Sequence, residues 1–259
     1  MLKKYINDFI VKDNIRLNHN TFLLILKHPS TLPQIAPGQF VEVLVADEPH
    51  TFLRRPLSVH DVDIEQNTLT LFVKIVGKGT EKLSHLLKGS TLNIIYPLGH
   101  SFTIVKSQKV LLAGGGCGIA PLMYLARVLL QNKCDVHILL GAQSNCDILL
   151  VDGYQKFGNV YFTTDDGSLG TKGFLIQHPI LKNEINTFER VYTCGPERMM
   201  HAVARIAKNN NVPCEVSLEN TMACGVGACL CCVVETTTGH KCVCTDGPVF
   251  NINDLKWQI

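Results

Sequence analysis

The chain has 259 residues, enough for two compact domains, or for two domains and a small appendage. Its 46% hydrophobic and 18% charged residues exclude a disordered chain and are typical of a folded globular protein. The formal net charge is only +2, and no run of Lys or Arg exceeds two residues. Composition therefore gives no electrostatic support for binding to nucleic acid or to an anionic membrane.

The beginning of the chain shows no recognisable signal peptide, because Lys3 to Asp8 is a polar stretch without an apolar core segment. The most apolar stretch, 110–126, contains four glycines and Pro121. It is therefore a poor membrane span. We expect a soluble, cytoplasmic protein that does not bind a membrane.

Short apolar runs alternate with turn residues over the first part of the chain, residues 1–102. Strands are expected at 21–26, 39–45, 69–76 and 91–96. One helix is expected at 81–87. Regular short strands with little helical periodicity predict a small antiparallel β-barrel domain.

Strands and helices alternate over the second part, residues 103–212. Strands are expected at 109–113, 136–140, 160–163 and 189–193, and helices at 121–131 and 197–208. This alternation predicts a doubly wound α/β domain with a parallel sheet. The remainder, 213–259, is rich in cysteine and is expected to form a third, small subdomain.

Cysteines cluster in this last part: six of the eleven lie between Cys224 and Cys244. In a reducing compartment they are not expected to form disulfides. Clustered cysteines then indicate metal binding or redox chemistry.

Cys224, Cys229 and Cys232 have the C-x4-C-x2-C spacing of plant-type [2Fe–2S] ferredoxins. Gly225 and Gly227 lie inside this loop, where glycine can turn backbone N–H groups towards a cluster without steric cost. A zinc site is the alternative, but structural zinc sites usually show two short C-x2-C pairs. The sequence therefore favours an iron–sulfur cluster.

The fourth ligand must come from the segment after Cys232, which is expected to form two antiparallel strands joined by a Thr-Gly turn. This pairing would place Cys244 opposite Val233 and next to Cys232. We therefore expect Cys244 to be the fourth ligand. Cys242 would lie one pair closer to the turn, and no role is expected for it or for Cys231.

A glycine-rich loop follows the strand at 109–113 and leads into a helix. Its candidate residues are Gly114, Gly115, Gly116, Gly118 and Pro121. Glycines let the backbone come close to a ligand, and the N–H groups at a helix N-terminus can bind a pyrophosphate. Taken alone, a tight turn without a ligand is nearly as plausible.

A second strand end, Cys194-Gly195-Pro196, also leads into a helix, as expected across the crevice of a nucleotide-binding sheet. Cys194 could equally be a small buried residue. No Lys or Arg occurs from Cys134 to Gln155, where a 2′-phosphate would be gripped. The sequence therefore favours NAD over NADP.

Two segments of the first part suit phosphate binding. Arg54-Arg55-Pro56-Leu57-Ser58 carries two guanidinium groups, which can bind phosphate bidentately. Gly79-Thr80 stands at a helix start. Alone, these are only a basic pair and a capped helix.

The order of these motifs resembles the ferredoxin–NADP reductase superfamily: R-P-L-S, V-G-K-G-T, Y-P-L-G, G-G-G-C-G-I-A-P and T-C-G-P. The cysteine segment ending in C-T-D-G-P is similar to the electron transfer subunits of class 1B dihydroorotate dehydrogenases. The resemblance covers essentially the whole chain. It departs at His100, where relatives more often continue with Asn-Gly.

This resemblance implies a set of cofactor-binding residues. FAD would be bound by Arg55, Pro56, Leu57, Ser58, Phe72, Val73, Lys74, Gly79 and Thr80. NAD would face the loop from Gly114 to Pro121 and Cys194, Gly195 and Pro196. A [2Fe–2S] cluster would be bound by Cys224, Cys229, Cys232 and Cys244.

The resemblance also implies a relay in pyrimidine biosynthesis. An FMN-containing partner subunit would oxidise dihydroorotate, and electrons would pass through the cluster and FAD to NAD, a diffusible substrate. A 2+2 heterotetramer is implied, and no residue of this chain need act as an acid or base. The alternatives are an NAD(P)H-dependent reductase subunit of a hydrogenase or sulfide dehydrogenase, and a zinc-stabilised binding module.

Overall fold

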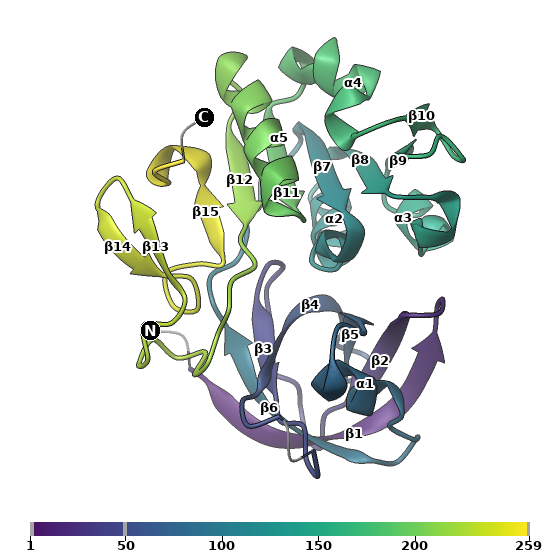
Figure 1. Ribbon diagram of the computed structural model, residues 1–259, viewed down its shortest axis with the longest axis vertical. Coiled ribbons are helices and arrows are strands. Elements are labelled where there is room, and N and C mark those ends of the chain that lie inside the picture. Colours follow the sequence, from purple (N-terminus) through teal and green to yellow (C-terminus); the bar gives the residue numbers. More distant parts are fainter. Residues whose placement is uncertain (1–2, 49–50, 258–259) are drawn as a thin grey trace.

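The computed structural model describes residues 3–48 and 51–257. A β-barrel lies below an α/β domain, and a small hairpin region is attached at one side (Figure 1). The predicted fold class, a barrel with a parallel-sheet domain and a cysteine-rich region, is confirmed.

Six antiparallel strands close the barrel in the order β1-β2-β5-β4-β3-β6. Their bounds are β1 Tyr5–Arg16, β2 Thr21–Lys27, β3 Phe40–Val43, β4 Arg55–Asp63, β5 Thr68–Lys74 and β6 Thr91–Leu98. Alternate residues of β2, such as Phe22, Leu24 and Leu26, are fully buried. This period of two places one face of each strand in the core.

The helix expected at 81–87 begins earlier, as α1 (Lys78–Ser84). The Thr80 hydroxyl explains the shift, because it accepts hydrogen bonds from the backbone N–H groups of Val76 (2.9 Å) and Gly77 (3.3 Å). These bonds close the first turn before residue 81.

The α/β domain is built on a seven-stranded sheet in the order β10-β9-β8-β7-β11-β12-β15. Its strands are β7 Lys109–Gly115, β8 Asp135–Ala142, β9 Asn159–Thr164, β10 Thr171–Lys172, β11 Arg190–Cys194, β12 Cys214–Ser217 and β15 Val249–Asn251. Its α-helices are α2 Leu122–Gln131, α3 Val151–Gln155, α4 Pro179–Lys182 and α5 Glu197–Asn209. Short 3-10 helices are η1 Gly116–Ile119, η2 Asn145–Asp147, η3 Leu175–Gln177, η4 Ile185–Thr187 and η5 Ile252–Asp254.

The sheet extends past residue 212, where the third part was expected to begin. β12 pairs in parallel with β11, and β15 pairs antiparallel with β12. The cysteine region is therefore built onto the edge of the sheet. The apolar periodicity of a four-residue strand such as β12 is too short to be read from sequence.

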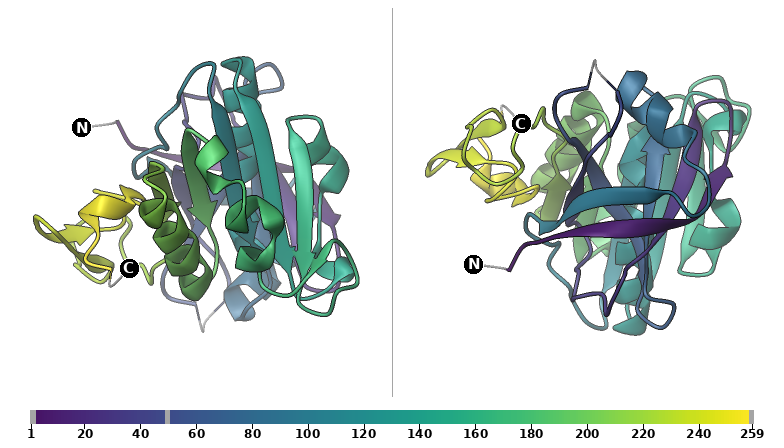
Figure 2. Two further views of the ribbon diagram at one scale, coloured as in Figure 1. Left: turned by 90° about the horizontal axis from the view of Figure 1, so that it is seen from above. Right: turned by 90° about the horizontal axis from the view of Figure 1, so that it is seen from below.

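The remaining strands, β13 (Val233–Thr236) and β14 (Gly239–Cys242), form a separate hairpin. This hairpin projects beside β12 and away from β9 and β10 (Figure 2). His100 is the residue where the sequence departs from the family pattern, and its backbone N–H donates to the carbonyl of Gly247 (2.6 Å). The barrel thus contacts the cysteine region directly.

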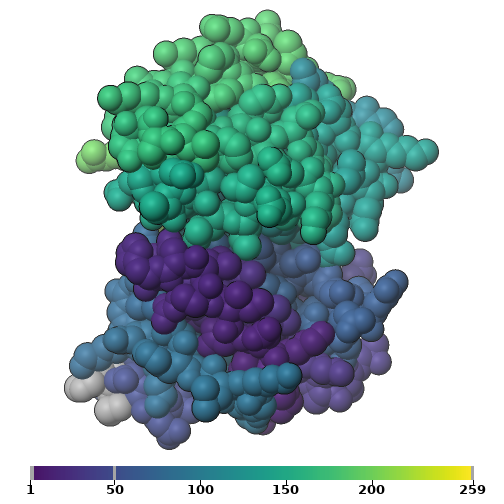
Figure 3. All heavy atoms as spheres, turned by 90° about the vertical axis from the view of Figure 1, so that its right-hand side faces the viewer, coloured from purple at the N-terminus to yellow at the C-terminus, as the bar shows by residue number. Residues whose placement is uncertain are grey.

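The barrel and the α/β domain meet along a broad boundary (Figure 3). Nδ1 of His60 in β4 donates to the carbonyl of Ala120 (2.8 Å), and the Tyr124 hydroxyl donates to the carbonyl of Ile35 (2.9 Å). Arg127 of α2 also pairs with the carboxylate of Asp61. No helix within residues 3–48 and 51–257 is long and apolar enough to cross a membrane.

Candidate functional site

A cavity of about 570 Å³ lies between the barrel and the α/β domain. Its walls come from β5, from the glycine loop after β7, from the ends of β8 and β9, and from the start of α5. In an open α/β sheet, ligands bind at the carboxyl ends of the strands near the point where strand order reverses. Here that point lies beside β7, so the cavity is where a nicotinamide cofactor is expected.

The two segments expected to face NAD contact each other. A Cβ at Gly118 would lie 2.3 Å from the carbonyl oxygen of Cys194 and 2.3 Å from the backbone of Gly195. A Cβ at Gly115 would lie 2.5 Å from the sulfur of Met199. At Gly118 the close atoms are backbone atoms, which cannot move aside as the Met199 side chain can, so only glycine allows this approach.

The predicted NAD-facing residues divide into two groups. Gly115, Gly116 and Pro196 line the cavity. Gly114, Gly118, Cys194 and Gly195 do not line the cavity but hold the two segments together, and Pro121 is the N-cap residue of α2. The Cys194 side chain is only 1% exposed, which fits the reading of a small buried residue.

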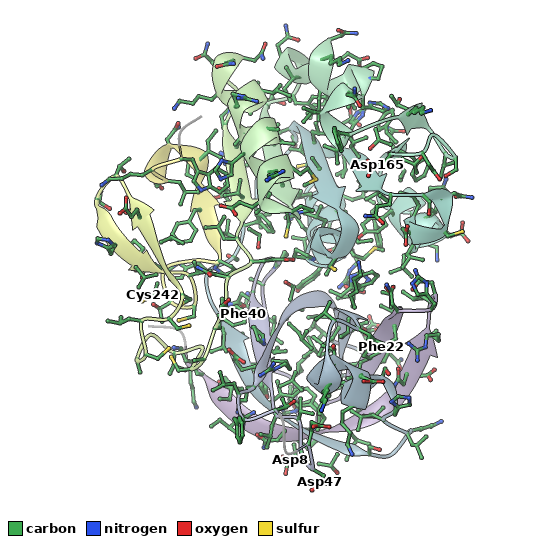
Figure 4. The ribbon with its side chains drawn as sticks, in the orientation of Figure 1. Asp8, Phe22, Phe40, Asp47, Asp165 and Cys242 are labelled. Carbon is green, nitrogen blue, oxygen red and sulfur yellow. The ribbon has the colours of Figure 1, made fainter. Side chains whose placement is uncertain are left out.

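Asp165 lines the cavity and was missed by the sequence reasoning. It follows the end of β9, on the side of the molecule away from the hairpin (Figure 4). A carboxylate at such a strand end can accept hydrogen bonds from the two hydroxyls of an adenosine ribose. The T-T-D-D-G sequence after β9 was the available signal.

The predicted FAD residues Arg55 and Gly79 lie side by side. A Cβ at Gly79 would be 3.4 Å from Cδ of Arg55. Arg55 donates hydrogen bonds to the carbonyls of Leu53 (2.8 Å) and Arg54 (3.1 Å), so its guanidinium stays near this helix start. The Thr80 hydroxyl already forms hydrogen bonds that cap α1, so the backbone at this helix start, and not the Thr80 side chain, is left to bind a phosphate.

The other predicted FAD residues lie on β4 and β5. Pro56, Leu57 and Ser58 of β4 are half-buried. On β5, Phe72 and Lys74 line the cavity. Val73, between them, is 1% exposed and packs in the barrel core, so its side chain is not available to the cofactor.

The four predicted cluster ligands form two pairs. The Cys244 N–H donates to the Cys232 sulfur (3.4 Å), and Cys229 is close enough to Cys224 to help lower the pKa of its thiol. A Cβ at Gly227 would lie 2.9 Å from the side chain of Thr245, so the loop of the first pair packs against the turn that carries Cys244. The loop that carries Cys224 and Cys229 therefore lies beside the segment that carries Cys232 and Cys244.

The loop after Cys224 is shaped to hold a thiolate. The N–H groups of Val226 (3.4 Å) and Ala228 (3.3 Å) donate to the Cys224 sulfur. Burial works against the thiolate, but these bonds and those from Cys229 lower the pKa of Cys224 to about 6. Gly225 and Gly227 provide the required turns with φ of 66° and 83°.

The expected hairpin register was wrong. The turn lies at Thr237 and Thr238, and Cys242, not Cys244, pairs with Val233. Gly239 begins β14 instead of completing the turn, which shifts the second strand by two residues. Cys244 reaches Cys232 differently: its N–H donates to the Cys232 sulfur (3.4 Å) from the turn after β14.

The cysteine geometry also bears on the zinc alternative. A zinc ion needs four ligands around a single centre. A two-iron cluster instead needs two thiolates on each iron, which suits paired sulfurs. The donor set thus fits a [2Fe–2S] cluster better.

Glu42 lies between the barrel and the cysteine loop and was also missed. Its side chain is 1% exposed, and neither carboxylate oxygen has a hydrogen-bond partner. Burial raises the pKa of Glu42 to about 7, against the opposing charges of Arg54 and Arg55. Its position in the apolar strand β3 was the available signal.

Family models match three successive stretches of the chain. Residues 8–102 match the oxidoreductase FAD-binding domain, and residues 112–205 match the oxidoreductase NAD-binding domain. Residues 219–256 match the iron–sulfur cluster binding domain of dihydroorotate dehydrogenase B. The chain thus contains the domains for all three predicted cofactors.

Curated relatives match over nearly the full length. One from Fusobacterium nucleatum is 34% identical over 97% of this chain and 98% of its own. One from Desulforamulus reducens is 39% identical over 92% of this chain and 94% of its own. Both are named "Dihydroorotate dehydrogenase B (NAD(+)), electron transfer subunit". The chain belongs to this family.

Solved structures of reductases are similar in fold to this chain. A structure of NADH-dependent reduced ferredoxin-NADP oxidoreductase is 30% identical, with a TM-score of 0.84 over 96% of this chain and 90% of that one. A ferredoxin reductase of carbazole 1,9a-dioxygenase is 21% identical with a TM-score of 0.71, which shows the shared fold.

Proposed function

We propose that this electron transfer subunit of an NAD-dependent dihydroorotate dehydrogenase holds its cluster at Cys224, Cys229, Cys232 and Cys244. The paired sulfurs, with backbone N–H groups directed at them, carry this assignment. When bound, the cluster passes single electrons, and the flavin exchanges single electrons for the two-electron chemistry of NAD. The protein's own part is to hold these groups in place and to choose the coenzyme.

In our proposal, FAD is held by Arg55 and the backbone at Gly79, with Phe72 and Lys74 towards the cavity. A guanidinium beside a helix start suits a pyrophosphate. NAD enters the cavity between this site and the glycine loop. The contact between Gly118 and Gly195 supports a loop kept in a fixed shape for the coenzyme's phosphates.

The partner in this proposal is an FMN-containing catalytic subunit that oxidises dihydroorotate to orotate, in a 2+2 heterotetramer. The names of the relatives, which call them electron transfer subunits, support a separate catalytic subunit. The eleven cysteines are all free in the structure, which supports placing the complex in the reducing cytoplasm. A reductase subunit of a hydrogenase or sulfide dehydrogenase is less well supported, since the cysteine region matches the dihydroorotate dehydrogenase model.

The test is to co-express the chain with the catalytic subunit encoded nearby, purify the complex without oxygen, and assay iron, FAD and FMN. We expect two irons and one FAD per chain and dihydroorotate-dependent reduction of NAD. Replacing each of the four proposed ligands by Ser should lower the iron content and abolish this activity while FAD stays bound. Cys146→Ser is the matched control, because Cys146 is exposed and remote from the hairpin.

Each part of the proposal can fail separately. Full iron content in Cys244→Ser would remove Cys244 from the ligand set. Iron and FAD without an FMN-containing partner would favour a reductase subunit of another complex. Zinc in place of iron, without flavin, would contradict the electron transfer function.

A further inference from the structure

Four charged side chains line the cavity between the barrel and the α/β domain: Lys74, Asp147, Asp165 and Arg198. Lys74 is among the residues proposed to lie beside FAD. Asp147 accepts a hydrogen bond from the Ser144 hydroxyl (2.9 Å). Arg198 has no role so far, although it is the cation that the α/β domain contributes to the described wall of the cavity.

Arg198 stands at a position where a helix disfavours a positive charge. α5 begins at Glu197, so Arg198 lies in the first turn of a 13-residue helix. The N-terminus of a helix carries a partial positive charge, which favours acidic side chains there and disfavours basic ones. A residue that breaks such a local rule without a compensating contact is expected at a functional site.

No contact in the described chain compensates the charge of Arg198. The carboxylate of Glu197, the preceding residue, lies 3.6 Å from Nε2 of His201, one turn along the helix. Within residues 3–48 and 51–257, Arg198 forms no ion pair or hydrogen bond. The residue is exposed and lines the cavity. Its guanidinium is therefore free to bind an anion that enters the cavity.

The packing of α5 places Arg198 beside the glycine loop. α5 packs against β11 and β12, and β11 is the neighbour of β7 in the sheet (Figure 1). A Cβ at Gly115 would lie 2.5 Å from the sulfur of Met199, the residue after Arg198. Gly116 and Pro196 line the same cavity. An anion bound to Arg198 would therefore lie next to the loop proposed to face the coenzyme's phosphates.

The strand order separates Arg198 from the place of a 2′-phosphate. Asp165, whose carboxylate can accept from the adenosine ribose, follows β9, whereas Arg198 follows β11. β8 and β7 lie between these two strands, so three interstrand spacings, roughly 14 Å in all, separate them. In a dinucleotide the diphosphate lies between the adenosine ribose and the nicotinamide. Arg198 is thus placed for the diphosphate and not for a group on the ribose.

We propose that Arg198 binds the diphosphate of the nicotinamide coenzyme through its guanidinium. The planar guanidinium can donate two N–H groups to two oxygens of one phosphate while its charge pairs with the anion. This inference rests on the proposed function, since it requires NAD in this cavity. Arg198 takes no part in hydride transfer, so it sets the affinity for the coenzyme and leaves the chemical step unchanged.

The test measures NADH oxidation by the purified anaerobic complex, with an artificial electron acceptor, for Arg198→Ala, Arg198→Lys and the control Arg205→Ala. Arg205 is exposed on the same helix but does not line the cavity. Arg198→Ala should raise KM for NADH about tenfold, the effect of losing hydrogen bonds to a charged group, and leave kcat unchanged. Arg198→Lys keeps the charge without the paired donors and should raise KM by a smaller factor. Arg205→Ala should change neither constant.

Inhibition by fragments of the coenzyme identifies the group that Arg198 binds. Adenosine diphosphate carries the diphosphate, adenosine carries no phosphate, and adenosine 2′-phosphate carries only the group specific to NADP. Arg198→Ala should raise the inhibition constant of adenosine diphosphate about tenfold and leave that of adenosine unchanged. Weaker inhibition by adenosine 2′-phosphate, with adenosine diphosphate unaffected, would overturn the inference by placing Arg198 at the 2′-position.

Thermal unfolding of the same variants separates binding from folding. Removing a cation from the first turn of α5 should not lower the unfolding midpoint, so a raised KM would reflect lost binding. Equal KM values in Arg198→Ala and Arg205→Ala would overturn the inference, as would equal losses for adenosine diphosphate and adenosine. A wild-type complex that contains FAD but does not oxidise NADH would instead overturn the proposed function, and the inference with it.

Discussion

Single residues set the chemistry of this subunit, and Asp165 is the clearest case outside the cysteines. Asp165 lines the cavity after β9, whereas its neighbour Asp166 is occupied by hydrogen bonds from Ser168 (2.9 and 2.6 Å). A carboxylate can accept from the ribose 2′-hydroxyl of NAD but repels the 2′-phosphate of NADP. The absence of Lys and Arg from Cys134 to Gln155 also favours NAD over NADP.

Asp165→Ser should weaken the discrimination between the two coenzymes. Removing the repulsion should raise kcat/KM for NADPH relative to NADH by about 10- to 100-fold, the range of 1.4 to 2.8 kcal/mol. Steady-state diaphorase assays with both coenzymes measure this ratio. Asp166→Ser is the control and should leave the ratio unchanged, since Asp166 does not line the cavity. An unchanged ratio in Asp165→Ser would place the ribose elsewhere.

At the scale of elements, the strand–loop–helix unit of β7, η1 and α2 depends on contact with the end of β11. Cys194 pairs with Gly114 in the sheet, and the chain then crosses beneath Gly118. The two segments are therefore one structural unit, although Gly118 and Cys194 lie 76 positions apart in the sequence. This packing places Pro196 and Gly116 on the same cavity wall.

Gly118→Ala should disturb both segments together. The added methyl would lie 2.3 Å from backbone atoms of Cys194 and Gly195, which cannot rotate away as a side chain could. We expect a loss of about 3 kcal/mol in unfolding free energy and a raised KM for NADH. Chemical denaturation and steady-state kinetics measure the two effects.

Gly153→Ala is the matched control for this change. Its Cβ would meet the flexible end of Met123 at 3.0 Å, and Gly153 lies in helix α3. We expect no loss of stability, because alanine is the better helix former by about 1 kcal/mol. Equal stability of the two variants would show that the loop accommodates a side chain at residue 118.

For the whole molecule, the relative position of the barrel and the α/β domain decides how far apart the flavin and NAD sites lie. His60 is buried at this boundary, with its ring 5.7 Å from that of Phe72. Its hydrogen bond with the carbonyl of Ala120 requires a proton on Nδ1. Burial lowers the pKa of His60, although Ala120 and the charge of Asp61 oppose the shift.

His60 should make stability depend on pH in a known direction. The folded state keeps His60 neutral, whereas the unfolded chain takes up a proton below about pH 6.5. Its contribution to stability is therefore fully present above that pH and is lost as pH falls. Thermal unfolding at pH 8 and pH 6 should show a larger fall in midpoint for the wild type than for His60→Asn.

The variant isolates this one group, because Asn can still donate an N–H to the Ala120 carbonyl but does not titrate. At pH 8 it should cost only about 1 to 2 kcal/mol, the loss of ring packing against Phe72. Parallel pH dependence in the two proteins would mean that His60 is protonated in the folded state.

The sequence by itself determined the modules of this protein and its cofactors. The spacing of Cys224, Cys229 and Cys232 and the glycine loop after β7 are local patterns, since neighbouring residues must bind one group. Strand and helix periods likewise predicted the barrel and the parallel sheet. Such features can be recognised in the sequence alone, because the interactions that cause them act between residues only a few positions apart.

Only the tertiary structure decided which residues face one another across distant segments. A two-residue shift of one turn placed Cys242 instead of Cys244 opposite Val233. Asp165 and Glu42 acquired their surroundings from strands that are remote in sequence. Register, burial and the approach of one domain to another depend on how the whole chain packs, and no local pattern carries that information.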